Sequence, residues 1–167
     1  TDTAAGERYA LDQLEPLAPP PYDGTSAPAP ARMRVHLIDV GQGAATLFEF
    51  SCAAVLVDTG GELNDEFDSA QALRSYLERF FFRRPDLDRT IALLVLTHPH
   101  IDHTRNAAMV TERYKVLNVV TDGVDHGSGS AEQLALEAWA RARKAGLFAA
   151  RVESIPRGGL TNAVVDP

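Results

Sequence analysis

The sequence of 167 residues contains a single cysteine, Cys52, so an intrachain disulfide framework and a cysteine-based zinc finger are excluded. No apolar run approaches the roughly 20 residues that a membrane-spanning helix needs, and we therefore expect no membrane span. Basic residues are outnumbered, with 16 Lys and Arg against 23 Asp and Glu. The resulting net charge of −7 argues against a basic surface that coats nucleic acid, although it leaves room for a local basic cleft. Neither a G-x-x-x-x-G-K-[ST] phosphate loop nor a G-x-S-x-G nucleophile elbow is present.

The composition divides the chain into two parts. A hydrophobic share of 45% and a charged share of 23% are typical of a globular protein, and the length suits one domain. Six of the ten prolines fall within residues 1–33, which show no sustained hydrophobic period. We expect residues 1–33 to form an extended Pro/Ala-rich leader or linker and residues 34–167 to form the domain.

Strand and helix patterns alternate from residue 34 onward. Short apolar runs predict a hairpin over 46–50 and 54–57, and the continuous run 91–96 is typical of a strand buried on both faces. Ser130 and Gln133 have the spacing of a capping box at the start of a helix. The expected strands are 35–40, 46–50, 54–57, 91–96, 116–120 and 148–155, and the expected long helices are 65–84 and 130–145. This order predicts an α/β (α+β layered) domain with helices covering a sheet.

The loop after the apolar run 91–96 concentrates side chains that bind metals. Four ligand types fall within residues 98–103 in the pattern H-x-H-x-D-H: His98, His100, Asp102 and His103. Imidazole nitrogen and carboxylate oxygen suit zinc, iron and manganese. Two pairs in this arrangement could each begin one site of a dinuclear centre. The alternative reading of the segment is a solvated polar loop.

Three motifs in order resemble the metallo-β-lactamase-fold hydrolases. HPHIDH is similar to the metal signature of that family, and VLVDTGG is similar to its first motif. HLIDVGQGAATLFEF resembles the first strands of the branch typified by the metallo-β-lactamase domain of the competence protein ComEC. The resemblance covers roughly residues 35–155 and implies the family's αββα sandwich, of which this chain resembles only the first αβ half.

The resemblance also implies roles for particular residues. His98 and His100 would bind a first metal, and Asp102 and His103 would bind a second, with two zinc ions expected and iron or manganese as alternatives. Asp58 would orient the ligand loop by hydrogen bonds from outside the metal's own ligand set. The family's reaction is hydrolysis by a metal-bound hydroxide, and Asp102 would help to orient the water. The ComEC-like branch suggests phosphodiester or nucleic-acid substrates, while lactams, thioesters and other esters stay open.

The sequence departs from the family pattern in two places. Ala44 follows the G-Q-G segment where the branch often has an aspartate, and no histidine follows His126 to supply the later metal ligands. Two protein ligands for each metal fall short of the three or four that zinc requires. We therefore expect a complementary C-terminal half. It would be a second polypeptide or a part of the protein outside this sequence, unless the protein is truncated.

Two other functions remain open from the sequence. The incomplete ligand set also suits a non-catalytic metal-binding or interaction module, and the same fold with iron would suit redox or oxygenase chemistry. The sequence indicates no cellular compartment.

Overall fold

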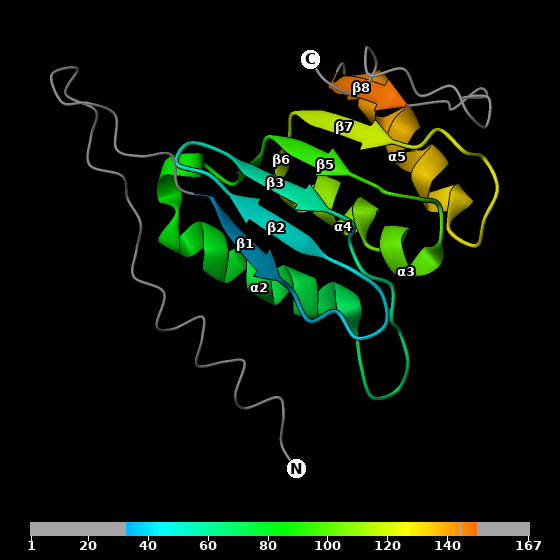
Figure 1. Ribbon diagram of the computed structural model, residues 1–167, viewed down its shortest axis with the longest axis horizontal. Helices are drawn as coiled ribbons and strands as arrows, with labels where there is room; N and C mark the ends of the chain where they lie inside the picture. The colour runs from blue at the N-terminus through cyan, green and yellow to red at the C-terminus, as the bar shows by residue number, and fades with distance from the viewer. Residues whose placement is uncertain (1–32, 144, 150–167) are drawn as a thin grey trace, which may run out of the picture.

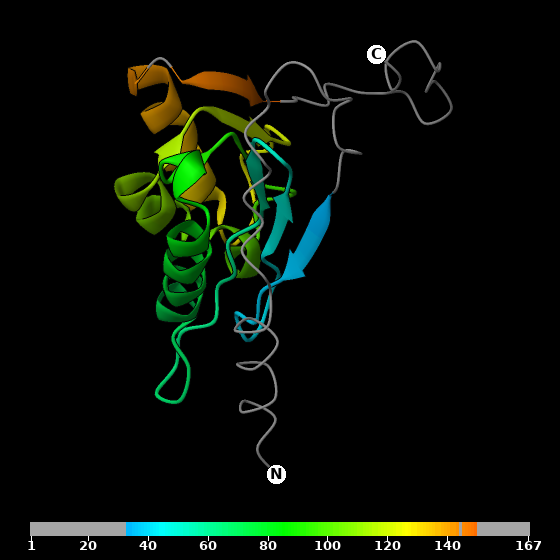
Figure 2. The ribbon, with the colours of Figure 1, turned by 90° about the vertical axis from the view of Figure 1, so that its left-hand side faces the viewer.

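The computed structural model describes residues 33–143 and 145–149. Its central feature is a six-stranded sheet with the strand order β1-β2-β3-β5-β7-β8, and the long helices lie on one face of it (Figures 1 and 2). A short two-stranded ladder pairs β4 with β6.

The strands are β1 (Arg34–Leu37), β2 (Thr46–Glu49), β3 (Ala54–Val57), β4 (Thr90–Ile91), β5 (Leu93–Val95), β6 (Lys115–Val116), β7 (Asn118–Thr121) and β8 (Gly146–Ala149). The helices are α2 (Ser69–Arg83), η1 (Pro85–Leu87), α3 (Ile101–Thr104), α4 (Ala107–Arg113) and α5 (Ser130–Arg143). The predicted α/β layered architecture is confirmed.

One strand of the sheet, β2, runs opposite to the other five. β1, β2 and β3 pair antiparallel, which confirms the predicted hairpin over β2 and β3. β3, β5, β7 and β8 pair parallel, and helices connect these strands across the sheet. Because β1, β3, β5 and β7 all run in the same direction, the loops after these four strands meet at one edge of the sheet.

Several element boundaries differ from the predicted ones. β1 ends at Leu37 instead of residue 40, because the chain turns from the sheet into the loop before Gly41. α2 begins at Ser69 instead of residue 65, since the Asp68 side chain accepts hydrogen bonds from the backbone N–H groups of Ala70 and Gln71 and so forms the N-cap. The predicted last strand, 148–155, begins two residues earlier as β8, and its residues 150–155 lie outside the described part. Of the predicted leader 1–33, only Met33 is described.

The predicted capping box at the start of α5 is wrong. Gln133 does not turn back to the helix start. Its Nε2 donates to Asp122 Oδ1 and to the Val124 carbonyl, both at 2.9 Å. The side chain is fully buried against the loop that follows β7, and its Oε1 has no partner in the described part of the chain. Gln133 therefore holds a loop beside the helix, while the Ser130 N–H donates to the Gly127 carbonyl.

The hydrophobic core lies between the sheet and the helices. Leu47, Leu56, Leu94 and Val119 are register neighbours on four adjacent strands, and each is 0% exposed. Leucines and phenylalanines of α2, spaced three or four residues apart, belong to the same core cluster: Leu73, Leu77, Phe80 and Phe81. Burial of one such side chain contributes about 1.5–3 kcal/mol, so this layer supplies much of the folding free energy.

No described helix covers the other face of the sheet (Figure 2). This face carries apolar side chains. Val35 and Leu37 on β1 are 50% and 82% exposed, and Leu93 and Val95 on β5 are only partly buried. The prediction that 91–96 is buried on both faces is therefore wrong for the described residues, because the helices cover one side of the sheet only.

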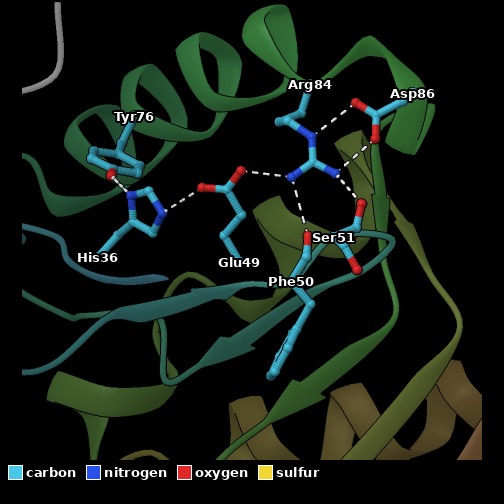
Figure 3. Close-up of polar contacts among 7 residues, drawn as sticks. All are labelled: His36, Glu49, Phe50, Ser51, Tyr76, Arg84 and Asp86. Carbon is cyan, nitrogen blue, oxygen red and sulfur yellow. Dashed lines mark hydrogen bonds and ion pairs between the residues drawn. The ribbon is translucent and has the colours of Figure 1, made fainter. Parts of the chain in front are cut away.

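A buried polar network fastens the edge strand β1 to α2 (Figure 3). His36 lies between the Tyr76 hydroxyl, 2.6 Å from Nδ1, and Glu49 Oε2, 3.0 Å from Nε2. Arg84 donates from Nη1 to Glu49 Oε1 at 2.6 Å and makes two further hydrogen bonds to the Asp86 carboxylate. These contacts give the buried Glu49 carboxylate a partner on each oxygen, as a charge in a core requires.

No helix within residues 33–143 and 145–149 is long and apolar enough to cross a membrane.

Candidate metal centre

The predicted ligand segment occupies the edge of the sheet where the strands end. β5 stops at Val95, and residues 97–100 lead directly into the short helix α3, which carries Asp102 and His103 (Figure 1). Asp58 comes directly after the neighbouring parallel strand β3. Loops beyond the carboxyl ends of parallel strands are where α/β proteins place ligands, because side chains from separate strands converge there.

The three histidines of the segment stand together. The ring centroids of His98 and His100 lie 4.7 Å apart with planes at 74°, and those of His98 and His103 lie 4.0 Å apart at 51°. His98 and His103 are partly buried, whereas His100 is exposed. Imidazole nitrogen is a common zinc ligand, so this group of rings is a candidate metal site.

Asp58 connects the end of β3 to this group. Its buried carboxylate accepts hydrogen bonds from the Thr97 N–H at 2.8 Å and from the Thr97 hydroxyl at 2.7 Å. Asp58 Oδ2 also lies 2.8 Å from His103 Nδ1. Because an ionised carboxylate only accepts, His103 donates from Nδ1, and in the neutral imidazole Nε2 then carries the lone pair that a ligand can use. Asp58 has φ of 58°, a left-handed conformation that aspartate tolerates better than most residues.

Asp102 and His103 are placed as a pair. His103 Nε2 lies 3.7 Å from Asp102 Oδ2. Two ligands at about 2.0–2.1 Å from a tetrahedral zinc ion are about 3.3 Å apart, so only a small movement separates this pair from ligation of one ion. The same Nε2 is the nitrogen that Asp58 leaves unprotonated.

Two glycines let neighbouring loops approach the segment closely. A Cβ at Gly43 would lie 1.9 Å from the Asp102 carbonyl oxygen, and one at Gly61 would lie 2.1 Å from the Ile101 carbonyl oxygen. The G-Q-G loop also donates a hydrogen bond from the Ala44 N–H to the Asp102 carbonyl at 3.3 Å. These contacts fix the backbone on which Asp102 stands.

Sequence reasoning did not identify a second group of positioning residues behind the segment. The Thr59 N–H and hydroxyl both donate to the His103 carbonyl, at 2.7 and 2.9 Å. Asn106 is buried and donates from Nδ2 to the Thr59 carbonyl and to the Ser69 hydroxyl. Thr97 was missed as well, and its hydroxyl also lies 3.0 Å from His98 Nδ1. The only sequence signal for these residues is their position beside the ligands, which a single sequence does not distinguish from ordinary loop polarity.

The donor set suits a metal ion but is incomplete. Neutral imidazole and carboxylate groups are zinc ligands, and a carboxylate behind His103 is their usual support. The described residues contain no group of three or more His, Cys, Asp or Glu side chains arranged to hold a metal ion. His126 does not join the cluster, since its side chain is 88% exposed beside Asp125. The structure thus brings together His98, His100, Asp102, His103 and Asp58, and further ligands would have to come from outside the described part.

Comparison with known proteins assigns the family. A family model described as the metallo-beta-lactamase superfamily matches residues 38–145, a span that includes Asp58 and the whole 98–103 segment. The chain therefore belongs to the metallo-β-lactamase superfamily, and its mixed α/β architecture is that of a partial metallo-β-lactamase fold. A search of the curated proteins finds no match. Membership indicates hydrolase activity in general and a metal such as zinc as its cofactor.

Proposed function

We propose that this chain is the first half of a metal-dependent hydrolase with a dinuclear zinc centre. The observation that carries the proposal is the position of His103 between Asp58 and Asp102, with Nδ1 engaged by the first carboxylate and Nε2 facing the second. In the neutral imidazole, Nε2 carries a lone pair 3.7 Å from Asp102 Oδ2, so one metal ion could bind both groups. Iron and manganese are the alternative metals for the same donors.

The proposal assigns each residue of the candidate site a separate role. His98 and His100 would hold one zinc ion, Asp102 and His103 would hold the other, and Asp102 would also orient the attacking water. When bound, the metal lowers the pKa of coordinated water and polarises the scissile carbonyl or phosphoryl group. Asp58 would keep His103 in the tautomer that binds. The D-V-G-Q-G segment at residues 39–43 supports a place in the ComEC-like branch, and we propose phosphodiesters, including nucleic acid, as the substrate class.

The uncovered sheet face supports a complementary half. Two rows of register neighbours run across it, the first formed by Val35, Phe48, Val55 and Leu93, and the second by Leu37, Thr46, Val57, Val95 and Val120. Eight of these nine side chains are apolar, and contiguous apolar surface of this extent marks an interface. A partner that covers this face with a second sheet and brings histidine and aspartate ligands to its edge would complete both metal sites.

The direct test is metal content per chain in the full-length native protein, measured by elemental analysis together with hydrolysis of bis(p-nitrophenyl) phosphate. We expect about two zinc ions per complete site, and loss of both metal and hydrolysis in His100→Ala and in Asp102→Ala. His126→Ala, which removes an exposed histidine outside the cluster, is the matched control and should change neither. Metal content that is the same in all four proteins would refute the site.

A non-catalytic interaction module is the second candidate, and the uncovered apolar face is the observation that favours it. Val57→Glu and Val95→Glu place a charge in the middle of this face, and Leu134→Glu on the exposed side of α5 is the control. For a hydrolase completed by a partner, the two face variants should lose bound zinc and activity as well as the partner. For a binding module, the wild type should contain no stoichiometric metal, and the two face variants should lose only the binding of the partner.

A further inference from the structure

A surface depression of about 390 Å³ opens beside the candidate metal centre. His100 and Asp102 form one side of it, and the loop between β3 and α2 forms the other through Gly61, Glu62 and Asn64. The depression therefore offers room for a molecule in contact with two of the four proposed metal ligands. Arg105 is the one lysine or arginine among the described residues that line it.

The Arg105 side chain is fixed at one atom and free at two. Its Nε donates to the Gly61 carbonyl at 2.6 Å, which anchors the guanidinium to the rim of the depression. Within the described residues, neither Nη atom of Arg105 takes part in a hydrogen bond or an ion pair, although two carboxylates line the same depression. Glu62 accepts instead from the Gln42 N–H and from Asn64 Nδ2.

Three other arginines of the described residues pair with carboxylates. Arg84 binds Glu49 and Asp86, Arg89 binds Glu78, and Arg141 binds Glu137. The Arg105 guanidinium is instead anchored through Nε to a backbone carbonyl, which leaves its two Nη groups available to a ligand in the depression. Its planar fork of N–H donors matches the two oxygens of a carboxylate or a phosphate, and anchoring at Nε reduces the entropy lost when such an anion binds.

We propose that Arg105 is an anion-binding residue of the substrate site, and that it holds a carboxylate or phosphate group of the substrate next to the bond that is cleaved. This inference rests on the proposed hydrolase function, since it names the substrate group that the same site accepts. It predicts a preference for anionic substrates at a rim that is otherwise acidic.

Anion binding tests the inference without any turnover. Inorganic phosphate and succinate are titrated by calorimetry into the full-length protein and three variants: Arg105→Gln, Arg105→Lys and Arg113→Gln. Arg105→Gln should weaken the binding of at least one anion about tenfold or more, and Arg105→Lys should restore part of it. Arg113 is an exposed arginine in the last turn of α4, away from this depression, and serves as the matched control. Binding that is unchanged in Arg105→Gln, or equally weakened in Arg113→Gln, overturns the inference.

Kinetics then separates this inference from the function on which it rests. p-Nitrophenyl acetate and mono-p-nitrophenyl succinate share a leaving group but differ in a carboxylate, and p-nitrophenyl phenylphosphonate and bis(p-nitrophenyl) phosphate supply phosphoryl substrates. If the anion is a substrate carboxylate, Arg105→Gln should raise KM for the succinate about tenfold and leave the acetate unchanged. If it is a phosphate, the rise in KM should appear for the phosphoryl substrates.

Two outcomes separate the anion site from the hydrolase function. If hydrolysis of every substrate is lost in His100→Ala but unchanged in Arg105→Gln, the anion site is refuted and the hydrolase function stands. If Arg105→Gln weakens anion binding but the full-length protein hydrolyses none of the substrates, the anion site is supported and the hydrolase function is refuted.

Discussion

His103 Nδ1 lies 2.8 Å from Asp58 Oδ2, and this contact joins two segments that are 45 residues apart in the sequence. Each segment follows a parallel strand, β3 or β5, so the sheet brings the two side chains to the same edge. The carboxylate determines which imidazole nitrogen carries the proton, and with it which nitrogen can bind a metal.

Replacing Asp58 by asparagine should weaken metal binding while the fold is kept. The amide side chain has nearly the same shape as the carboxylate and tolerates the left-handed backbone, but it lacks the charge and one of the acceptor atoms that Thr97 and His103 use. We expect zinc affinity, measured by competition with a chromophoric chelator, to fall about 10–100-fold. Asp65→Asn, in the exposed loop before α2, is the control. Equal affinity of the Asp58→Asn variant and the wild type would show that Asp58 does not support the ligand loop.

Replacing Gly61 by alanine should displace the metal segment. The new Cβ would lie 2.1 Å from the Ile101 carbonyl oxygen and 2.4 Å from Asp102 Cα, and both are backbone atoms that cannot move alone. We expect a loss of about 2 kcal/mol or more in the free energy of unfolding, measured by urea denaturation, together with lower metal content. Gly123→Ala is the comparison. Gly123 has φ of 71° but no close neighbour among the described residues, so its variant should cost only about 1–2 kcal/mol of backbone strain and should leave the metal content unchanged.

Removing the Arg84 side chain should destabilise the fold far more than removing that of Arg89. Arg84 and Glu49 are almost completely buried, with side-chain exposures of 3% and 8%, and Arg84 also donates to the carbonyls of Phe50 and Ser51 (Figure 3). Arg84→Ala leaves a buried carboxylate without its cation, at a cost of about 3–5 kcal/mol. Arg89→Ala breaks an ion pair with Glu78 that is well exposed to water, at a cost of about 0–1 kcal/mol. Equal denaturation midpoints for the two variants would contradict this account.

Stability should depend on pH through His36. Burial lowers the pKa of His36 below its usual 6.5, and the neighbouring Arg83 and Arg34 act in the same direction, while the hydrogen bond and charge of Glu49 act against it. The unfolded chain then binds a proton at a higher pH than the folded chain does. The contribution of His36 is complete above pH 6.5 and is lost as the pH falls toward the lowered folded-state pKa.

His36→Gln isolates this effect from the histidines of the candidate metal centre. We expect the free energy of unfolding of the wild type, from urea titrations between about pH 7.5 and 5, to fall more steeply with decreasing pH than that of the variant. The absolute stability of the variant should also be lower, because Tyr76 and Glu49 lose a partner. If the free energy of unfolding falls with decreasing pH equally in both proteins, His36 does not cause the pH dependence of stability.

The sequence by itself determined the layered α/β class and the hairpin of β2 and β3, and it located the candidate metal-ligand segment at residues 98–103. Hydrophobic periodicity and ligand spacing are local properties, and they are visible in a run of a few residues. The position of Asp58 in the site was available from a resemblance to a family motif, although no local pattern links it to His103.

Tertiary structure alone decided the rest, because it depends on which segments meet. The 91–96 run looks the same in sequence whether helices cover one face or both, and only the packing shows that Leu93 and Val95 face an open side. Ser130 and Gln133 have capping-box spacing, yet the loop after β7 offers Gln133 better partners than its own helix does. Arg105 is one of several arginines in the sequence. The role proposed for it depends on the Gly61 carbonyl, 44 residues away, which holds its guanidinium at the edge of the candidate site.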